Sequence, residues 1–567
     1  MKQRTAKRPL IAALVVAGVA LAGCSSSSAG DTSADANPTD QGAGWPETAE
    51  ISLVPGKPGG TFRLGIVEPT AIDPYNAQES EGILVTQYLF SSLVKFEPDG
   101  TVAPAVAEKW ESDASCATWT FTLKKGTTFH NGEEVTSESF KRGWERVAAK
   151  TAASDVAYHL APIKGFTEMN GGKADSLSGV DATDPGVLKV SLAEPDCEFY
   201  LRTGHTVFSP VPSVAGAADN KQFNEQPIGN GPFMMDGPWQ HDVGIKLKRF
   251  ENYTVGPKAY LDAVEISITA NGNQDEYDGF NNGSFDWARI PVPLLPQARA
   301  ANESKGNWIR KNTNGMNFLL PMVTQKPLDS ADARKAISMA IDRDAIIKGI
   351  FGGSQTAATS FVPPVFKDAF QEGVCTACTF DLAKAKELAA KAGLVPGTEL
   401  KFQINTGGGH EEWSAAVKQQ LEKNLGLKVD FSAVEFRDML ENQQQPGASG
   451  IFRLAWGADY PTPGNFLGPL LSTASIGAPA DKPVIGDNRG RYSNKAFDDL
   501  LAKAQATSDA GARTTLYQQA EKLAIGDDLA LIPLWNRTQN RLANSAKFTN
   551  LRMDFNENPD LSVISVK

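Results

Sequence analysis

One helix start in the chain carries residues that could bind a metal. His410-Glu411-Glu412-Trp413-Ser414 begins like the helix of a zinc protease, in which two histidines four residues apart hold the ion. Ser414 stands in the place of the second histidine, and a single helical histidine cannot build that site. The other four histidines are scattered along the sequence. We therefore expect no metal site.

The remaining patterns that could support catalysis are incomplete. Gly229-Asn230-Gly231 lacks the third glycine of a dinucleotide-binding loop, and the sequence has neither a phosphate-binding loop nor a Gly-x-Ser-x-Gly motif. The carboxylate pairs Glu133-Glu134 and Asp498-Asp499 are adjacent in sequence, as on a solvated surface. We expect a protein that has no cofactor and is not an enzyme. A secreted hydrolase stays open as an alternative, because catalytic triads are assembled in space.

The first residues of the chain resemble an export signal. Four basic residues and no acidic residue precede the 13-residue apolar run Leu10–Ala22, which is too short for a membrane-spanning helix. The run ends in Leu21-Ala22-Gly23-Cys24, which is similar to the cleavage and lipidation site of bacterial lipoproteins. We expect residues 1–23 to be a signal peptide and Cys24 to carry the lipid. The mature protein would be extracytoplasmic, lipid-anchored to the outer face of the cell membrane.

The net charge excludes one class of partner. The 567 residues include 55 Lys and Arg and 66 Asp and Glu, a formal net charge of −11. Removal of residues 1–23 takes away four positive charges and leaves −15. Nucleic acid is therefore not an expected partner, because phosphates require a basic surface. Residues 24–56 are expected to be the lipidated cysteine and a flexible tether, since Ser25 to Ala49 contains no Lys or Arg.

Four cysteines remain after the lipidated one, and an oxidising compartment favours their pairing. Cys375 and Cys378 are the natural local pair, which leaves Cys116 with Cys197. The motif Cys375-Thr376-Ala377-Cys378 could instead be half of a zinc site, but no second cysteine pair or histidine cluster lies near it in the sequence. The motif also lies in a loop before an expected helix, which disfavours a thioredoxin-like redox role.

The body of the chain has the pattern of a mixed α/β protein. Alternating apolar residues predict strands at 61–67, 119–123 and 245–248. Apolar residues that recur at helical spacing, together with capping residues, predict helices at 332–350, 381–392, 495–507 and 512–525.

One unit of strand, helix and strand is informative about ligand binding. Residues 399–405 are expected to be a strand, 411–425 a helix and 427–434 a second, parallel strand. Thr406-Gly407-Gly408-Gly409-His410 links the first strand to the helix. Ligands of such sheets lie outside the carboxyl ends of the strands, near helix N-termini. The loop therefore either approaches a ligand closely or is a plain flexible connection.

Four sequence blocks resemble the family-5 extracellular solute-binding proteins, the oligopeptide, dipeptide and nickel receptors of ABC importers. The blocks are residues 107–133, which include Trp119-Thr120-Phe121-Thr122-Leu123, residues 229–253, which begin with Gly229-Asn230-Gly231-Pro232-Phe233, residues 334–343 and residues 492–521. Their order and spacing agree with the family from about Lys57 to the C-terminus.

The resemblance implies an α/β, two-lobed periplasmic-binding-protein-like fold, or Venus flytrap, with an extra inserted domain. Lobe I would be discontinuous, at 57–90, 209–313 and 538–567. Domain II would be inserted at 91–208, and lobe III would span 314–537. The ligand would bind in the cleft, and the lobes would close around it by a hinge. The names lobe I, domain II and lobe III refer to these residue ranges from here on.

The segment Trp456-Gly457-Ala458-Asp459-Tyr460 resembles the part of oligopeptide binders that holds the peptide N-terminus. By this resemblance Asp459 pairs with the α-ammonium group, the backbone at Gly457 adds a strand to the ligand, and Trp456 walls the pocket. The alternative is that Asp459 caps a turn before Pro461. Enteric oligopeptide binders carry a disulfide-bonded cysteine where this chain has Gly457.

Arg453, His410 and Phe436 fall where oligopeptide binders place further ligand contacts. Arg453 and His410 would meet the C-terminal carboxylate of the peptide, and a helix N-terminus at His410 would favour that anion. The alternatives are a strand arginine in a salt bridge and a surface histidine. Phe436 matches an aromatic position of the ligand pocket, with a core phenylalanine as the alternative.

The implied function is that of the extracytoplasmic substrate-binding lipoprotein of an ABC transporter, which captures oligopeptides and delivers them to a membrane permease. The expected partners are a peptide ligand, the permease subunits of the importer, and the membrane through the lipid anchor. The protein is expected to be a monomer. A dipeptide, a nickel chelate, a sugar or a signalling peptide remains an alternative ligand.

Overall fold

The computed structural model describes residues 45–406 and 409–567. The expected signal peptide, Cys24 and the first part of the expected tether lie outside these residues, as do Gly407 and Gly408 of the glycine loop. The described residues all belong to one compact unit. Within the described ranges, every helix is too short or too polar to cross a bilayer.

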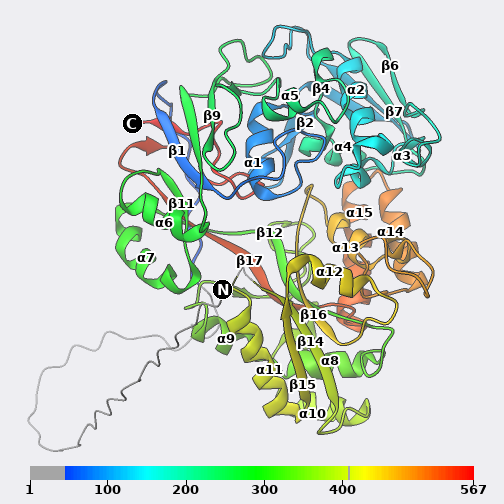
Figure 1. Ribbon diagram of the computed structural model, residues 1–567. Coiled ribbons are helices and arrows are strands. Elements are labelled where there is room, and N and C mark those ends of the chain that lie inside the picture. Colours follow the sequence, from blue (N-terminus) through cyan, green and yellow to red (C-terminus); the bar gives the residue numbers. More distant parts are fainter. Residues whose placement is uncertain (1–44, 407–408) are drawn as a thin grey trace, which may run out of the picture. The chain divides into compact units, whose positions relative to one another are not determined.

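A mixed sheet of eleven strands runs through the described part of the chain (Figure 1). The strand order is β15-β14-β16-β12-β17-β11-β1-β10-β9-β8, and β13 pairs with β17 at the side. The strands are β1 Thr61–Ile66, β8 Phe233–Met235, β9 Gly244–Arg249, β10 Ala263–Ile268, β11 Trp287–Arg289, β12 Trp308–Pro321, β13 Thr356–Ala357, β14 Glu399–Asn405, β15 Lys428–Val434, β16 Ile451–Gly457 and β17 Ile532–Ala543. Segments that are distant in sequence therefore lie side by side. For example, β1 lies between β10 and β11 and pairs with both.

The two long strands β12 and β17 connect the lobe I strands to the lobe III strands of this sheet. They pair antiparallel from Trp308 opposite Leu542 to Leu319 opposite Ile532. The register shifts between Asn312 and Met316. Beside the shift, the Thr313 hydroxyl donates to the Arg537 carbonyl oxygen at 3.0 Å. The expected borders of lobe III, at 313/314 and 537/538, fall in the middle of both strands at this irregularity.

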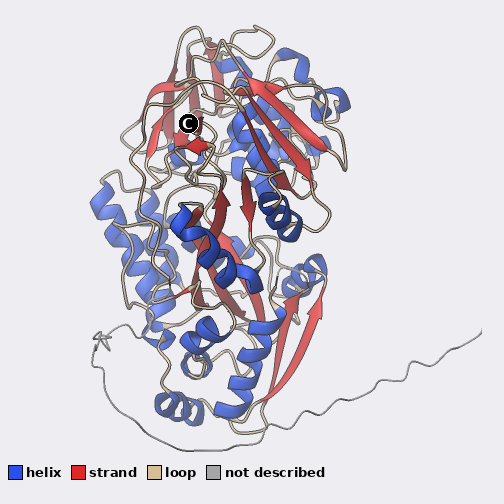
Figure 2. Cartoon of the chain, turned by 90° about the vertical axis from the view of Figure 1, so that its left-hand side faces the viewer, coloured by secondary structure: helices blue, strands red, loops and turns tan. Residues whose placement is uncertain are grey.

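Lobe III carries helices on its part of the sheet, as the lower half of Figure 1 and the rotated view in Figure 2 show. They are α8 Ala331–Met339, α9 Arg343–Gly349, α10 Leu382–Lys391, α11 Glu411–Leu425, α12 Phe436–Gln444, α13 Gly464–Leu471, α14 Lys495–Gln505 and α15 Ala510–Glu521. The predicted strand–helix–strand unit is confirmed, because β14 and β15 pair in parallel with α11 between them in sequence.

The prediction of one helix over residues 332–350 is wrong. Helix α8 ends at Met339, and α9 begins at Arg343. The Asp342 side chain accepts a hydrogen bond from the Ala345 backbone N–H at 2.9 Å, and the backbone of Asp342 is extended. An N-cap aspartate in this conformation starts a new helix, although the apolar spacing continues through the break.

Domain II has a sheet of its own. Its four described strands lie in the order β4-β5-β7-β6, and β2 pairs with β3 beside them. These strands are β2 Val94–Phe96, β3 Val102–Pro104, β4 Ala107–Ser112, β5 Thr118–Leu123, β6 Val180–Asp184 and β7 Val187–Ser191; the helices are α2 Ser137–Ala148, α3 Phe166–Asn170 and α4 Phe199–Arg202. The domain has its own buried apolar cluster, which includes Phe121, Phe140 and Trp144.

Lobe I and lobe III also have separate apolar clusters. The lobe I cluster draws on β1, on the segment from 211 to 309 and on the C-terminal residues up to Ile564, and the lobe I helices are α1 Ser80–Leu89, α5 Lys221–Glu225, α6 Asn273–Asn281 and α7 Leu295–Asn302. The lobe III cluster runs from Met316 to Trp535 and adds Phe555. The short strands β18 Phe548–Thr549 and β19 Ser565–Val566 pair near the C-terminus. We keep the three-part division as a proposal that these clusters support.

The structure forms two disulfides, Cys116–Cys197 within domain II and Cys375–Cys378 within lobe III. This is the expected pairing. Cys375 and Cys378 flank a short 3₁₀ turn that precedes α10, so the motif lies in a loop as anticipated.

The described end of the expected tether is held against the body. The Trp45 N–H donates to the Gly353 carbonyl oxygen at 2.9 Å, and the Trp45 ring packs edge-on against Trp308. Thr48 exchanges backbone and side-chain hydrogen bonds with Arg310 on β12. In the described part of the expected tether, Trp45, Thr48 and Val54 have backbone hydrogen bonds to the body. The flexible tether over residues 24–56 stays a prediction.

Candidate functional site

Asp459 lies in the loop that leaves β16 and leads into α13. The Asp459 backbone N–H donates to Asn465 Oδ1 at 2.8 Å, and Asn465 Nδ2 donates to Asp459 Oδ2 at 3.2 Å. Trp456 Nε1–H donates to the Asn465 carbonyl oxygen at 2.8 Å. Asn465 is buried in the first turn of α13, so it fixes the Asp459 carboxylate and the Trp456 indole together. Sequence reasoning missed Asn465.

The Asp459 carboxyl group is held in a partly desolvated place. Burial, opposed by the Asn465 hydrogen bond and the Arg202 guanidinium and aided by the nearby Asp487 carboxylate, raises its pKa to about 6. Among the described residues, an ionised Asp459 thus forms no ion pair with a lysine, arginine or histidine. Such a carboxylate gains most from a ligand that brings its own positive charge.

Gly457 lies at the end of β16, opposite Gly315 on β12. A side chain at Gly315 would overlap Arg537, because its Cβ would come within 2.7 Å of the Arg537 Cδ atom. At Gly457 the corresponding Cβ would lie 3.4 Å from Arg537 Nη1. The two glycines therefore let Arg537 pass over the end of β16 and the middle of β12, next to the segment that carries Asp459.

Arg453 and His410 are brought together at the other end of β16. Arg453 Nη1 donates to Asn405 Oδ1 at 3.3 Å, and Arg453 Nε has no hydrogen-bond partner among the described residues. Burial and, to a smaller extent, the nearby Arg537 together lower the pKa of Arg453 to about 10. Burial also lowers the pKa of His410 to about 3, with Arg453 adding to the shift. The corner offers a charged guanidinium whose positive charge is only partly compensated, which suits an anion.

His410 precedes α11 as its N-cap residue, and its Nδ1 accepts a hydrogen bond from Trp413 Nε1–H at 3.4 Å. Its place at a helix N-terminus is the one the sequence predicted. Phe436 is the first residue of α12, and 49% of its surface is exposed. This excludes a core phenylalanine, while a role of Phe436 in the ligand pocket stays a prediction.

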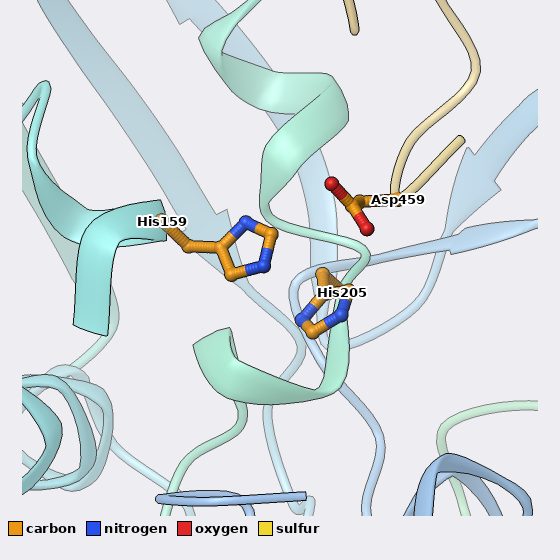
Figure 3. Close-up of side chains that lie close together, drawn as sticks. All are labelled: His159, His205 and Asp459. Carbon is orange, nitrogen blue, oxygen red and sulfur yellow. The ribbon is translucent and has the colours of Figure 1, made fainter. Parts of the chain in front are cut away.

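Two histidines of domain II face Asp459, which the sequence did not indicate (Figure 3). One ring nitrogen each of His159 and His205 and one Asp459 carboxylate oxygen all lie within 4.8 Å of one another. The two rings are stacked, with centroids 4.4 Å apart and an interplanar angle of 25°. The scatter of the histidines along the sequence did not reveal this pair, because the fold brings together residues that are 46 positions apart.

This cluster contains the residue types of a metal site, but its geometry does not fit one. Zinc binds imidazole nitrogen at about 2.0–2.1 Å, along lone pairs that lie in the ring planes. The nearly parallel rings of His159 and His205 direct their nitrogens side by side and not toward one point. In addition, His205 Nδ1 already accepts the Val207 N–H at 3.2 Å, which places the proton of the neutral ring on Nε2.

Domain II also docks on lobe III through a buried carboxylate beside Asp459. Glu198 Oε1 accepts from the Thr462 hydroxyl at 2.8 Å, and Glu198 Oε2 accepts from the Tyr517 hydroxyl at 2.5 Å. Arg513 Nε lies 3.2 Å from Glu198 Oε1. Thr462 belongs to the same loop as Asp459, so this contact ties the Asp459 loop to domain II.

Several cavities are lined by described residues. One of about 340 Å³ is bordered by Arg537, Arg541 and Glu557, and one of about 620 Å³ lies between lobe I and domain II beside Phe96 and Phe555. Asp459 lines neither of them. The larger cavity is mostly apolar and lies away from the charged groups described above. We therefore place the candidate site along β16, because the charged side chains there could bind a ligand.

Comparison with known proteins places the chain in a family. Residues 101–478 match the bacterial extracellular solute-binding proteins, family 5. The chain belongs to this family. Its relatives include the oligopeptide-binding protein OppA of Bacillus subtilis (strain 168), 29% identical over 84% of this chain and 87% of OppA. Another is the probable deoxycholate-binding periplasmic protein YgiS of Escherichia coli (strain K12), 28% identical over 82% of this chain and 86% of YgiS.

Solved structures give the same fold. The murein tripeptide binding protein MppA of Escherichia coli matches with a TM-score of 0.72 and 24% identity, over 91% of this chain and 99% of MppA. Haemophilus influenzae OppA in complex with RPPGFSPFR matches with a TM-score of 0.71 and 21% identity, over 91% of this chain and all of that chain. The protein therefore has the mixed α/β, two-lobed fold of periplasmic binding proteins, as the sequence predicted.

Proposed function

We propose that this protein is the peptide-capturing component of an ABC importer. The observation that carries the proposal is the placement of Asp459, which is held by Asn465 beneath domain II and forms no ion pair with another described residue. A peptide always has one ammonium group at its N-terminus, whatever its side chains are. One carboxylate can therefore anchor peptides of many sequences.

The opposite charge at the other end of β16 supports a peptide as the ligand. Arg453 and Asp459 are six residues apart, which corresponds to about 20 Å at most in extended chain. A short peptide bound beside β16 could place its ammonium at Asp459 and its carboxylate near Arg453 and His410. Backbone hydrogen bonds along the strand segment at Gly457 would hold the peptide without reading its side chains.

Capture would proceed by closure of the lobes around the ligand. We infer that the hinge lies in β12 and β17, at the register shift between Asn312 and Met316, because both strands cross from lobe I to lobe III there. Closure removes water from the ion pairs and strengthens them. The closed form would then be recognised by a membrane permease, while a lipid on Cys24 would keep the receptor at the outer face of the membrane.

Calorimetry with purified protein that begins after Cys24 tests the proposal. Tri- to pentapeptides should bind with one site per chain and be recovered intact. N-acetylated peptides, which lack the ammonium, should bind at least tenfold more weakly, and Asp459→Asn should remove this difference. Hydrolysis of the peptide, or equal affinity for acetylated and free peptide, would contradict the proposal.

A further inference from the structure

The face of domain II that covers Asp459 has no assigned role in ligand binding. We propose that His159 is a second acceptor for the ammonium group of the ligand, so that domain II selects ligands with an unsubstituted primary ammonium. The inference rests on the proposed function, since it assigns a specificity-determining residue to the Asp459 site.

The spacing of the cluster suits an ammonium group. The selected His159 nitrogen and Asp459 carboxylate oxygen lie within 4.8 Å of each other, so one donor nitrogen can lie about 2.8 Å from both acceptors at once. Hydrogen bonds between a nitrogen donor and an oxygen or nitrogen acceptor span about 2.7–3.2 Å. Neither imidazole forms a hydrogen bond or ion pair with Asp459 among the described residues, so the space between them is not closed by a direct contact.

His159 is able to accept a hydrogen bond there. Burial, the neighbouring His205 and Arg202 all hold the pKa of His159 well below its usual value, so its ring is neutral and one nitrogen has a free lone pair. Within the described residues the His159 ring makes stacking contacts, to Tyr158 and His205, and no side-chain hydrogen bond. The ring is thus held in place while its nitrogens remain uncommitted.

His205 has a different part in this arrangement. Its Nδ1 is occupied by the Val207 N–H, so Nε2 carries the proton and acts as a donor. His205 supports the face of His159 by stacking and can donate toward the Asp459 carboxylate. It is a positioning residue, and the ammonium acceptors are Asp459 and His159.

The other charged groups near Asp459 are occupied elsewhere. Arg202 Nε lies 3.2 Å from Asp196 Oδ2, and its guanidinium lies over the Tyr460 ring at 4.7 Å. Asp487 pairs with Arg489 at 3.1 Å. Because neither Arg202 nor Arg489 forms an ion pair with Asp459 among the described residues, the ligand can supply the cation that Asp459 lacks.

Two acceptors make the number of N–H donors on the ligand matter. A primary ammonium has three N–H donors and can bond to Asp459 and His159 together. A dimethylated ammonium keeps its positive charge but has one N–H, so it can bond to only one of them. Affinity should therefore fall when the charge is kept and donors are removed.

The test compares one peptide with a free, an N,N-dimethylated and an N-acetylated N-terminus by calorimetry at pH 7.5. The wild-type protein should bind the dimethylated peptide about tenfold or more weakly than the free peptide. His159→Phe keeps the stacked ring and its size but removes the acceptor, and it should bind both peptides within about threefold of each other. His159→Gln restores an acceptor oxygen and should regain part of the preference. His241→Asn, an exposed histidine on lobe I, is the matched control and should behave like the wild type.

The outcomes separate this inference from the proposed function. An undiminished preference in His159→Phe would mean that the methyl groups are rejected by shape, and it would overturn the role of His159. Loss of the distinction between free and acetylated peptide in the wild-type protein would overturn the Asp459 anchor itself. Binding of Zn²⁺ or Ni²⁺ alone that is abolished by His159→Phe would make the cluster a metal site and would also overturn the inference.

Discussion

Asp459, the two histidines that face it and His410 at the other end of β16 differ in the pH at which they change charge. Burial raises the pKa of Asp459 to about 6. Burial lowers the pKa of His205 to about 4 and that of His410 to about 3, and the pKa of His159 is also depressed. Between pH 5 and pH 7, therefore, Asp459 is the residue of this group whose charge changes.

Peptide affinity should consequently fall on acidification through pH 6. An ammonium ligand binds the ionised form, so binding lowers the pKa of Asp459, and the free protein must lose a proton to bind below pH 6. The dissociation constant should be constant from about pH 7 to 8 and should rise by up to tenfold per unit below pH 6. Calorimetry from pH 4.5 to 8 measures this profile.

Two variants identify the group responsible for the loss of peptide affinity at low pH, the acid limb of the profile. Asp459→Asn should bind weakly with no acid limb. His241→Asn should keep the wild-type profile, although the pKa of His241 is raised by hydrogen bonds to Glu68 and Glu225. An acid limb that survives in Asp459→Asn would assign the titration to another residue.

Some residues of the candidate site could be predicted from the sequence, and others could not. Asp459, Arg453 and His410 were predicted because they lie in segments that resemble a family. His159, His205 and Asn465 were not, because their roles arise from contacts between segments. His159 reaches Asp459 across 300 positions of sequence, and only tertiary packing creates that proximity.

At the scale of elements, the edge of domain II at α4 is the part most directly linked to the Asp459 loop. Cys197 N–H donates to the Gln505 carbonyl oxygen of lobe III at 2.8 Å, and the Cys116–Cys197 disulfide ties this edge to the sheet of domain II. Glu198 adds the hydrogen bonds to Thr462 and Tyr517 and the ion pair with Arg513. These contacts hold domain II against lobe III.

Glu198→Gln should weaken this docking and reduce peptide affinity. Removing the charge leaves the mostly buried Arg513 without its carboxylate, and breaking a buried ion pair on one side costs about 3–5 kcal/mol. Because the contact forms only when domain II and lobe III meet, part of that cost appears as weaker ligand binding. Calorimetry should show at least a tenfold loss, while the binding stoichiometry stays at one.

A double-mutant cycle with Arg513→Gln separates the ion pair from the other contacts of Glu198. The double variant should recover part of the affinity, since it no longer buries an unpaired guanidinium. Glu194→Gln removes an exposed carboxylate from the same segment and should have no effect. An affinity of Glu198→Gln equal to that of the wild type would show that this docking does not contribute to capture.

Element boundaries followed from the sequence where local signals agree. The strand at 399–405 and the helix at 411–425 have the predicted bounds, because apolar periodicity, a terminal glycine and turn residues point to the same limits. The break at Asp342 was missed because apolar residues continue at helical spacing through Ile341, which is buried beside the new helix start. The spacing of apolar residues alone does not reveal the N-cap residue at which a new helix begins.

At the scale of the molecule, the proposed mechanism requires that β12 and β17 bend together. Both strands cross from lobe I to lobe III, and a register shift interrupts their pairing between Asn312 and Met316. A bulge of this kind allows a strand to change direction while its neighbours stay paired. Which strands carry the hinge could not be read from the sequence, because β12 and β17 are more than 200 residues apart and meet only in the folded sheet.

Peptide binding should therefore bring lobe III toward lobe I and domain II in solution. In the structure domain II contacts lobe III through Glu198, which hydrogen-bonds to Thr462 and pairs with Arg513. Small-angle X-ray scattering of protein that begins at Gly42 should show a smaller radius of gyration when a saturating peptide is added, since ligand binding shifts the population toward the closed form. Asp459→Asn at the same peptide concentration should show no decrease. Identical scattering of the wild-type protein with and without bound peptide would mean that capture does not involve closure, and the hinge in β12 and β17 would lose its role.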